Sequence, residues 1–181
     1  YIAAHNGQEI SGKTVGIIGF GHIGQNIDRL LTGFDVNVLA YARHSHEVVN
    51  GRMATLDEIY EQSDFIVTAL PATPETTHMI NADVFSKMKS SAVLVNIGRG
   101  ALIDEVALID ALKNDVIAGA GLDVVENEPI SADNPLLQLP NAFVTPHVAM
   151  ISQEAMDNVA IKAAEDIVRV LSGEQPRFPV N

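Results

Sequence analysis

The stretch that decides the fold reads Val15-Gly16-Ile17-Ile18-Gly19-Phe20-Gly21-His22-Ile23-Gly24. Its first four residues are small or apolar, as in a buried strand, and residues 23–32 carry apolar side chains at helical spacing. The three glycines of the Gly-x-Gly-x-x-Gly run therefore stand between a predicted strand and a predicted helix. A strand, a tight glycine turn and a helix in this order are typical of a loop that cradles a diphosphate.

Each glycine of this loop has its own expected role. Gly19 permits the tight turn, Gly21 lets the backbone approach a pyrophosphate without a Cβ in the way, and Gly24 lets the helix pack closely on the strand. Backbone N–H groups and the helix dipole then hold the anion. A lone motif of this kind is also compatible with a flexible turn. Strand, loop and helix coincide here in one unit, which favours dinucleotide binding.

The alternation of strand and helix continues along the chain and predicts a doubly wound parallel sheet. The further predicted strands are apolar on both faces, as strands covered by helices on both sides must be, and they occupy residues 36–41, 65–68, 92–96, 117–122 and 142–145. Further helices are predicted at residues 55–62, 82–88, 104–113 and 152–171. Thr55 precedes Glu58 in the spacing of a capping box. The long loop over residues 126–139 is expected to be functional.

Bulk composition excludes several classes of protein. No apolar run approaches the ~20 residues that a membrane span needs, so no membrane partner is expected. A formal charge of -12 repels phosphate backbones, which argues against nucleic acid as a partner. The chain has no cysteine and shows no helical spacing of histidine ligands, so we expect neither a disulfide nor a metal site. These features predict a cytoplasmic protein with a single domain over residues 1–181.

Five motifs, in order along the chain, resemble the signatures of the D-isomer-specific 2-hydroxyacid dehydrogenases. They are Gly12 to Gly24, Leu70-Pro71-Ala72-Thr73-Pro74-Glu75-Thr76, Val95-Asn96-Ile97-Gly98-Arg99-Gly100, Gly121-Leu122-Asp123-Val124 through Glu128-Pro129, and Thr145-Pro146-His147. The resemblance implies a Rossmann-type dinucleotide-binding domain. It also implies a homodimer, and a substrate domain that is largely absent because it would lie mostly before Tyr1. The ends of the chain would then be linkers towards that domain.

The chemistry of 2-keto acid reduction selects three candidate catalytic residues. The reaction needs a hydride donor, a cation for the substrate carboxylate and carbonyl, and an acid that protonates the forming alkoxide. Arg99 and His147 each follow a predicted strand end, where ligands collect in open α/β sheets. The resemblance assigns the carboxylate and carbonyl to Arg99 and an acid/base pair to His147 and Glu128. Taken singly, Arg99 is equally a surface charge, Glu128 a solvated carboxylate and His147 a structural histidine.

The resemblance also implies a set of cofactor contacts. His22 and Ile23 would line the diphosphate. The remaining contacts are Ala69, Leu70, Pro71 and Thr76 on the adenosine side and Ile97, Gly98 and Asp123 on the nicotinamide side, with Ala149 in the same predicted set. Asp123 would accept a hydrogen bond from the carboxamide and so orient the ring. Its alternative role is a helix or turn cap.

One position departs from the pattern of NAD-preferring proteins. Such proteins carry an acidic residue at the end of the second strand, which binds the ribose 2′-hydroxyl. Here Ala42 occupies that place, and Arg43 and Ser45 follow it. A carboxylate would repel a 2′-phosphate, whereas Arg43 and Ser45 can bind one. The sequence therefore predicts NADP as the preferred cofactor, with NAD as the other possibility, unless these residues form only a surface turn.

These observations favour an NAD(P)-dependent oxidoreductase that interconverts a small 2-keto acid and a D-2-hydroxy acid by hydride transfer. The isolated chain is expected to be inactive, because the residues that shape the substrate pocket belong largely to the absent domain. A corepressor-like module of the same family, in which the dinucleotide sets the oligomeric state, is the alternative. An amino-acid dehydrogenase is a third reading, and the lack of lysine at the catalytic positions weighs against it.

Overall fold

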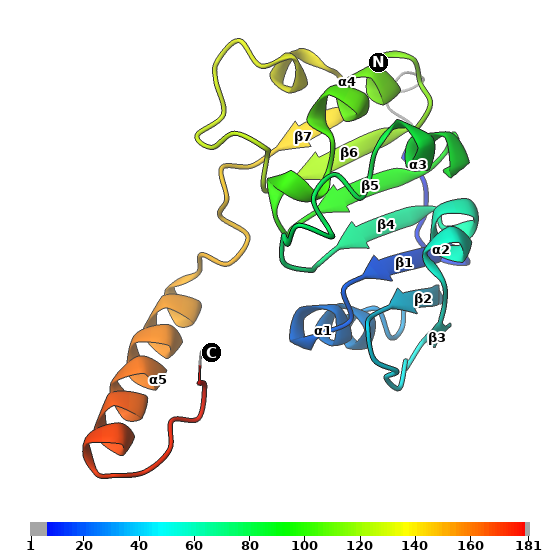
Figure 1. Ribbon diagram of the computed structural model, residues 1–181. Helices are drawn as coiled ribbons and strands as arrows, with labels where there is room; N and C mark the ends of the chain where they lie inside the picture. The colour runs from blue at the N-terminus through cyan, green and yellow to red at the C-terminus, as the bar shows by residue number, and fades with distance from the viewer. Residues whose placement is uncertain (1–6, 180–181) are drawn as a thin grey trace. The chain divides into compact units, whose positions relative to one another are not determined.

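The computed structural model describes residues 7–179, which fall into two compact units (Figure 1). The first unit runs to Pro146 and contains a sheet with its helices. The second begins at His147 and contains one long helix. The ends of the chain are predicted to be linkers towards a further domain, and the terminal residues 1–6 and 180–181 lie outside the described range.

The first unit is built on a sheet of seven parallel strands. The strands lie in the order β3-β2-β1-β4-β5-β6-β7. Their bounds are β1 Thr14–Ile18, β2 Asn37–Tyr41, β3 Gly51–Met53, β4 Phe65–Thr68, β5 Val93–Asn96, β6 Gly119–Leu122 and β7 Ala142–Val144. The predicted doubly wound sheet is confirmed. Strand order reverses between β1 and β4, and ligands of such sheets bind at the carboxyl ends of the strands at this point.

Helices cover the two faces of the sheet unequally. α1 (His22–Leu30) covers the face that carries the cluster of Val15, Ile17, Phe20, Val38 and Ala40. α2 (Leu56–Gln62), α3 (Ala82–Lys87) and α4 (Glu105–Lys113) lie over the other face, above a larger core (Figure 1). Short 3-10 turns occupy η2 (Gly100–Leu102) and η3 (Pro135–Gln138). The two cores hold the strands in register and so fix where each strand ends.

Helix starts follow the cap chemistry of the sequence. Thr55 accepts a hydrogen bond from the Glu58 backbone N–H at 3.2 Å, and the Glu58 carboxylate accepts one from the Thr55 N–H at 2.8 Å. Hydrogen bonds from Arg52 and Thr55 lower the pKa of the Glu58 carboxyl to about 2. The predicted capping box is therefore present. Because it begins α2 directly after β3, it also fixes one side of the pocket described below.

Three elements were not predicted from the sequence: β3 and the two 3-10 turns, η2 and η3. β3 is a three-residue edge strand with two exposed positions, so it lacks the apolar run by which the other strands are recognised. The segment predicted as a loop over residues 126–139 contains η3, which begins where the Asn134 side chain accepts a hydrogen bond from the Leu136 N–H. η3 is a single capped turn with one buried apolar residue, Leu136. It is too short to show a helical period in the sequence, so it was not predicted.

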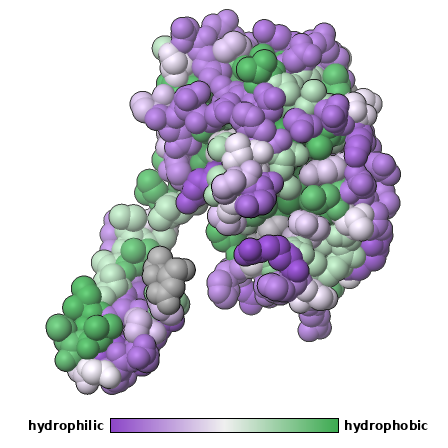
Figure 2. Space-filling model, in the orientation of Figure 1, coloured by the Kyte–Doolittle hydropathy of each residue, from purple (hydrophilic) through white to green (hydrophobic). Residues whose placement is uncertain are grey.

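The second unit consists mainly of α5 (Gln153–Leu171), which begins at the Ser152 cap as the sequence predicts. None of its residues is buried. Several are large and apolar, including Ile167, Val170 and Leu171, and Figure 2 shows green apolar side chains gathered at one end of this helix. Within residues 7–179, no helix is long and apolar enough to cross a membrane.

The contact between α1 and β1 gives a test of the fold. A Cβ at Gly24 would lie 2.3 Å from the Gly19 carbonyl oxygen and 3.2 Å from Ile17 Cγ2. Gly24→Ala should therefore push α1 away from β1 and lower the free energy of unfolding by about 1–2 kcal/mol, net of the gain in helix propensity. Gly121→Ala is the matched control, because its Cβ would meet only Val95 Cγ2 at 4.0 Å. Equal stability of the two variants in urea unfolding would contradict this packing.

Candidate functional site

The glycine loop lies at the point where strand order reverses. Gly19 has φ of +100°, and its N–H donates to the Tyr41 carbonyl at 2.9 Å. A Cβ at Gly19 would lie 2.6 Å from the carbonyl carbon and oxygen of Ala69, which follows β4. Both the backbone conformation and the close approach require glycine. The loop is thereby braced against the ends of β2 and β4.

The N-terminus of α1 has the features of an anion site. Gly21 is its N-cap residue, and within the described chain no side chain caps this end. A Cβ at Gly21 would meet nothing within 4 Å, so the missing side chain opens free space in front of the helix. His22 and Ile23 are exposed there. Backbone N–H groups at a helix start lack intrahelical partners and bind phosphate well. The residues present therefore fit a dinucleotide diphosphate.

Leu70 connects this loop to the end of β5. Its Cβ would lie 2.8 Å from a Cβ placed at Gly19, and its carbonyl oxygen would lie 2.8 Å from one placed at Gly98. The predicted diphosphate loop and nicotinamide side therefore both pack closely against Leu70, which is predicted to lie on the adenosine side. In the same segment the Thr76 hydroxyl donates to the Pro71 carbonyl at 3.0 Å and accepts from the Thr73 N–H at 2.7 Å. Thr76 thus shapes the turn that presents Pro71.

The predicted substrate cation, Arg99, leaves the end of β5 and is exposed. Its Nη1 donates to the Gly98 carbonyl oxygen at 2.7 Å. The next residue, Gly100, packs so closely on the loop after β6 that a Cβ there would lie 1.9 Å from the Val125 carbonyl oxygen. The arginine turn and the segment that leads to Glu128 are therefore packed together.

Sequence reasoning missed the buried polar residues beneath this turn. Asn96 and Thr68 are both 0% exposed and end the neighbouring strands β5 and β4. The Thr68 hydroxyl donates to Asn96 Oδ1 at 2.7 Å, and the Asn96 amide donates to the Arg99 carbonyl oxygen at 3.0 Å. A polar residue at the end of an otherwise apolar strand, three positions before Arg99, was the available signal.

Asp123 lies beside this network. It is 8% exposed, and its N–H donates to the Asn96 carbonyl oxygen at 3.0 Å. The Thr145 hydroxyl donates to its carboxylate at 2.5 Å. β5, β6 and β7 therefore bring Ile97, Gly98 and Asp123 to one edge of the sheet. Their contact with a nicotinamide ring stays a prediction.

Glu128 lies in an exposed loop that is tied to the rest of the first unit at several points. Its Oε1 accepts a hydrogen bond from the Val125 N–H at 3.1 Å. The Glu105 carboxylate accepts from the Glu126 N–H at 3.0 Å and from the Asn134 amide at 2.7 Å. Glu126 is also 2.6 Å from His78 Nε2. Glu105, at the start of α4, thus holds the loop at its first residue and again at Asn134, and sequence reasoning did not single it out.

His147 and Ala149 belong to the second unit. His147 is its first residue, is exposed and has φ of +56°, a conformation uncommon for residues other than glycine. Such outliers concentrate at functional sites. The pairing of His147 with Glu128 and the contact of Ala149 with a cofactor stay predictions.

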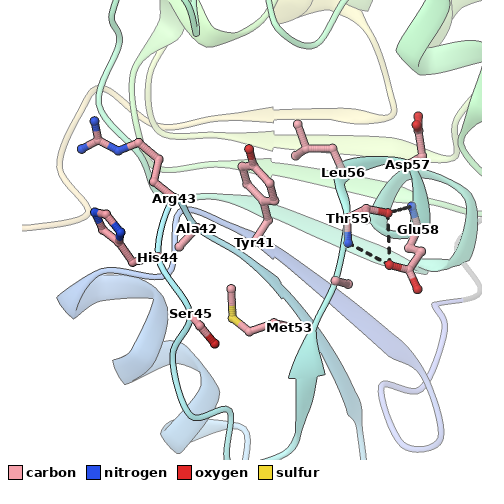
Figure 3. Close-up of a pocket in the computed structure, with 11 residues that line it drawn as sticks. Tyr41, Ala42, Arg43, His44, Ser45, Met53, Thr55, Leu56, Asp57 and Glu58 are labelled. Atoms are coloured by element: carbon pink, nitrogen blue, oxygen red, sulfur yellow. Dashed lines mark hydrogen bonds between the residues drawn. The ribbon is translucent and has the colours of Figure 1, made fainter.

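The residues predicted to select the cofactor line a pocket at the ends of β2 and β3. It is bounded by Tyr41, Ala42, Arg43, His44, Ser45, Met53, Ala54, Thr55, Leu56, Asp57 and Glu58. Figure 3 shows Arg43 and His44 reaching outward on the side away from the capping box. Ala42 places no carboxylate at the predicted ribose position.

The carboxylates of this pocket are paired with cations other than Arg43. Two carboxylates line the pocket, but Asp57 is 2.7 Å from Lys87 Nζ and Glu58 is 2.8 Å from Arg52 Nη2. Hydrogen bonds from Thr73 and from its own backbone N–H lower the pKa of Glu75, and the charge of Arg43 lowers it further. The charge of Arg43 therefore reaches Glu75, in the turn after β4 that is also predicted to face adenosine. No salt bridge to Arg43 lies within residues 7–179.

Comparisons with known proteins agree with this geometry. Residues 2–149 match the family described as the NAD-binding domain of D-isomer specific 2-hydroxyacid dehydrogenases. Glyoxylate/hydroxypyruvate reductase B of Escherichia fergusonii is 41% identical over 180 residues, which are 97% of this chain and 56% of that protein. The Serratia proteamaculans reductase of the same name is 43% identical over 97% of this chain and 55% of its own length. The chain thus spans little more than half of these relatives.

Solved structures give the same result. A D-lactate dehydrogenase from Lactobacillus jensenii with NAD+ has a TM-score of 0.90 and 32% identity, over 96% of this chain and 57% of that one. An NADPH-dependent glyoxylate/hydroxypyruvate reductase from Sinorhizobium meliloti, in complex with NADP and sulfate, has a TM-score of 0.88 and 31% identity, over 98% and 58%. The chain belongs to the family of NAD-binding domains of the D-isomer specific 2-hydroxyacid dehydrogenases.

Proposed function

We propose that this chain binds NADPH or NADH across the carboxyl edge of its sheet and that the full-length protein uses it to reduce a 2-keto acid to a D-2-hydroxy acid. One observation carries the proposal: Gly19 and Gly98 both contact Leu70, so the loop for the diphosphate and the turn before Arg99 form one continuous surface. The uncapped start of α1 supplies the anion-binding end of that surface. The similar reductases named above support the reaction class.

The residues of the chain divide the chemistry between them. A bound reduced nicotinamide supplies the hydride. Arg99 binds the substrate carboxylate with its planar guanidinium and stabilises negative charge that develops on the carbonyl oxygen. His147 donates the proton that completes the alcohol, and Glu128 orients its ring. Asp123 holds the carboxamide, so that one ring face meets the substrate.

The preferred cofactor is NADPH. Ala42 leaves the end of β2 without the carboxylate that would repel a 2′-phosphate, while Arg43 and Ser45 stand at the same strand end. The two carboxylates of the pocket are each engaged by a cation, so they oppose the phosphate less than free charges would. The Sinorhizobium meliloti reductase, described as NADPH-dependent, shows that this fold accommodates NADP.

Three further expectations stay predictions. These are a homodimer, a cytoplasmic location and a single domain over residues 1–181. The small-molecule substrate is a 2-keto or 2-hydroxy acid whose side chain this chain does not select, because Arg99 recognises only the carboxylate and carbonyl that all such acids share.

Dinucleotide binding by this chain is the first test. Gly21→Val should weaken NADPH binding at least about tenfold, because the new side chain fills the space in front of α1 that the diphosphate occupies. Its thermal stability should fall little, since nothing lies within 4 Å of that Cβ. Calorimetry with Gly7→Val as the control measures the change, because Gly7 also has open space around it. Undiminished binding by Gly21→Val would refute the diphosphate site.

Turnover by the full-length protein is the second test. His147→Asn should lower kcat for 2-keto acid reduction by about 100- to 10,000-fold, because the alkoxide loses its proton donor. Its NADPH dissociation constant should stay within about twofold, since the acid does not hold the diphosphate. The isolated chain should show little turnover. A His147→Asn enzyme with normal kcat would exclude His147 as the acid, and a full-length protein inactive on every 2-keto acid would favour the corepressor-like alternative.

Cofactor preference is the third test. The full-length enzyme should have a higher kcat/KM with NADPH than with NADH, by about ten- to a hundredfold, the value of a charge-assisted hydrogen bond. The double variant Ala42→Asp/Arg43→Ala should move the preference towards NADH by restoring the ribose acceptor and repelling the phosphate. Arg29→Ala, which removes an exposed arginine from the last turn of α1, is the control. A wild type that favours NADH tenfold would overturn this assignment.

A further inference from the structure

Asn96 joins three segments of the candidate site although it is fully buried. Its Oδ1 accepts hydrogen bonds from the Thr68 hydroxyl at 2.7 Å and from the Gly98 N–H at 3.0 Å. Its Nδ2 donates to the Arg99 carbonyl oxygen at 3.0 Å. Its backbone carbonyl oxygen accepts from the Asp123 N–H at 3.0 Å. The chain after β5 is therefore held by four polar contacts that converge on one residue.

An amide is the side chain that these contacts require. Two donors point at Oδ1 and one acceptor faces Nδ2, so the group must accept on one side and donate on the other without a charge. Thr68, which supplies one of the donors, is also 0% exposed. If either Thr68 or Asn96 lost its side-chain partner, water could not take that partner's place. Buried polar groups without partners are costly, and a fully satisfied buried network specifies one conformation.

The conformation that this network fixes is that of the turn before Arg99. The side-chain oxygen of Asn96 accepts from the N–H two residues on, which is an Asx turn, while the amide nitrogen holds the carbonyl three residues on. Arg99 then continues in an extended conformation, with φ of -143° and ψ of 145°. Its Nη1 donates to the Gly98 carbonyl oxygen at 2.7 Å, so the guanidinium is tied to the same turn.

We propose that Asn96, supported by Thr68, is the positioning residue of Arg99: the buried amide sets the turn from which the guanidinium reaches the substrate. The inference rests on the proposed function, because it assigns Asn96 a task only if Arg99 binds the substrate carboxylate and carbonyl. It extends that function by one residue that touches neither the substrate nor the cofactor through its side chain. Its action is entirely through the backbone of Gly98 and Arg99.

The main experiment is a double-mutant cycle in the full-length protein, with kcat/KM for glyoxylate at saturating NADPH as the measurement. Asn96→Ala should lower kcat/KM by about 100-fold, the effect expected when a binding group is displaced by about 1 Å. In an Arg99→Ala background the same substitution should change kcat/KM by less than about threefold, because the group that it positions is gone. Asn37→Asp is the control, because it alters an asparagine at an exposed position at the start of β2, and it should leave kcat/KM unchanged.

A conservative variant separates positioning from folding. The carboxyl introduced by Asn96→Asp keeps both acceptor contacts, but it donates to the Arg99 carbonyl only when protonated. Burial raises the pKa of such a carboxyl. The ratio of variant to wild-type kcat/KM should therefore be near one at acid pH and fall as pH rises. Thr68→Val removes one donor to Asn96 Oδ1 and should lower kcat/KM about fivefold. This variant keeps the positioning role testable if Asn96→Ala does not fold.

The possible outcomes separate the positioning role of Asn96 from the substrate role of Arg99. Equal loss from Asn96→Ala with and without Arg99 would show that Asn96 acts elsewhere, and the positioning role would be rejected while the proposed function stands. A pH-independent ratio for Asn96→Asp would reject it likewise. An Arg99→Ala enzyme with wild-type kcat/KM would reject both the substrate role of Arg99 and this inference.

Discussion

Backbone segments at the carboxyl ends of β1, β4 and β5 approach one another too closely for side chains at Gly19 and Gly98. A Cβ at either position would lie within 2.8 Å of a backbone atom of Ala69 or Leu70. Such contact is possible only where glycine occupies the turn. The rest of the site depends on it, because the diphosphate loop, the adenosine side and the arginine turn become one surface. Side chains at these positions would force the strand ends apart.

This arrangement explains how an acidic chain can hold an anionic cofactor. With a formal charge of -12, the chain repels phosphate at long range, so binding must come from local geometry. The start of α1 offers backbone N–H groups beside open space, and neither depends on net charge. Arg43 adds a cation at the end of β2, where Arg52 and Lys87 engage the neighbouring carboxylates. In the proposed function, the fixed dipoles of α1 therefore supply the affinity for the diphosphate, and Arg43 is the residue proposed to select between the two cofactors.

Most strands and helices were predictable because their signals are local. The glycine run, the apolar strands and the cap at Thr55 each act within a few residues, and the structure confirms them. β3 was missed because an exposed three-residue edge strand carries no apolar period. Asn96, Thr68 and Glu105 were missed for another reason. Their importance comes from partners that are distant in sequence: Thr68 and Asn96 are 28 positions apart. A polar residue at the end of an apolar strand marks Asn96 as unusual, but no local pattern records which residue it pairs with.

An amide NMR titration of the 15N-labelled chain with NADPH can show whether the carboxyl edge of the sheet is one dinucleotide site. We expect saturable shifts that are largest for the N–H groups of residues 19–24, Leu70 and Gly98, with the shift at Arg43 smaller when NADH replaces NADPH. Saturable shifts confined to α3 and α4, or no saturable shift in the glycine loop, would contradict a dinucleotide site at this edge.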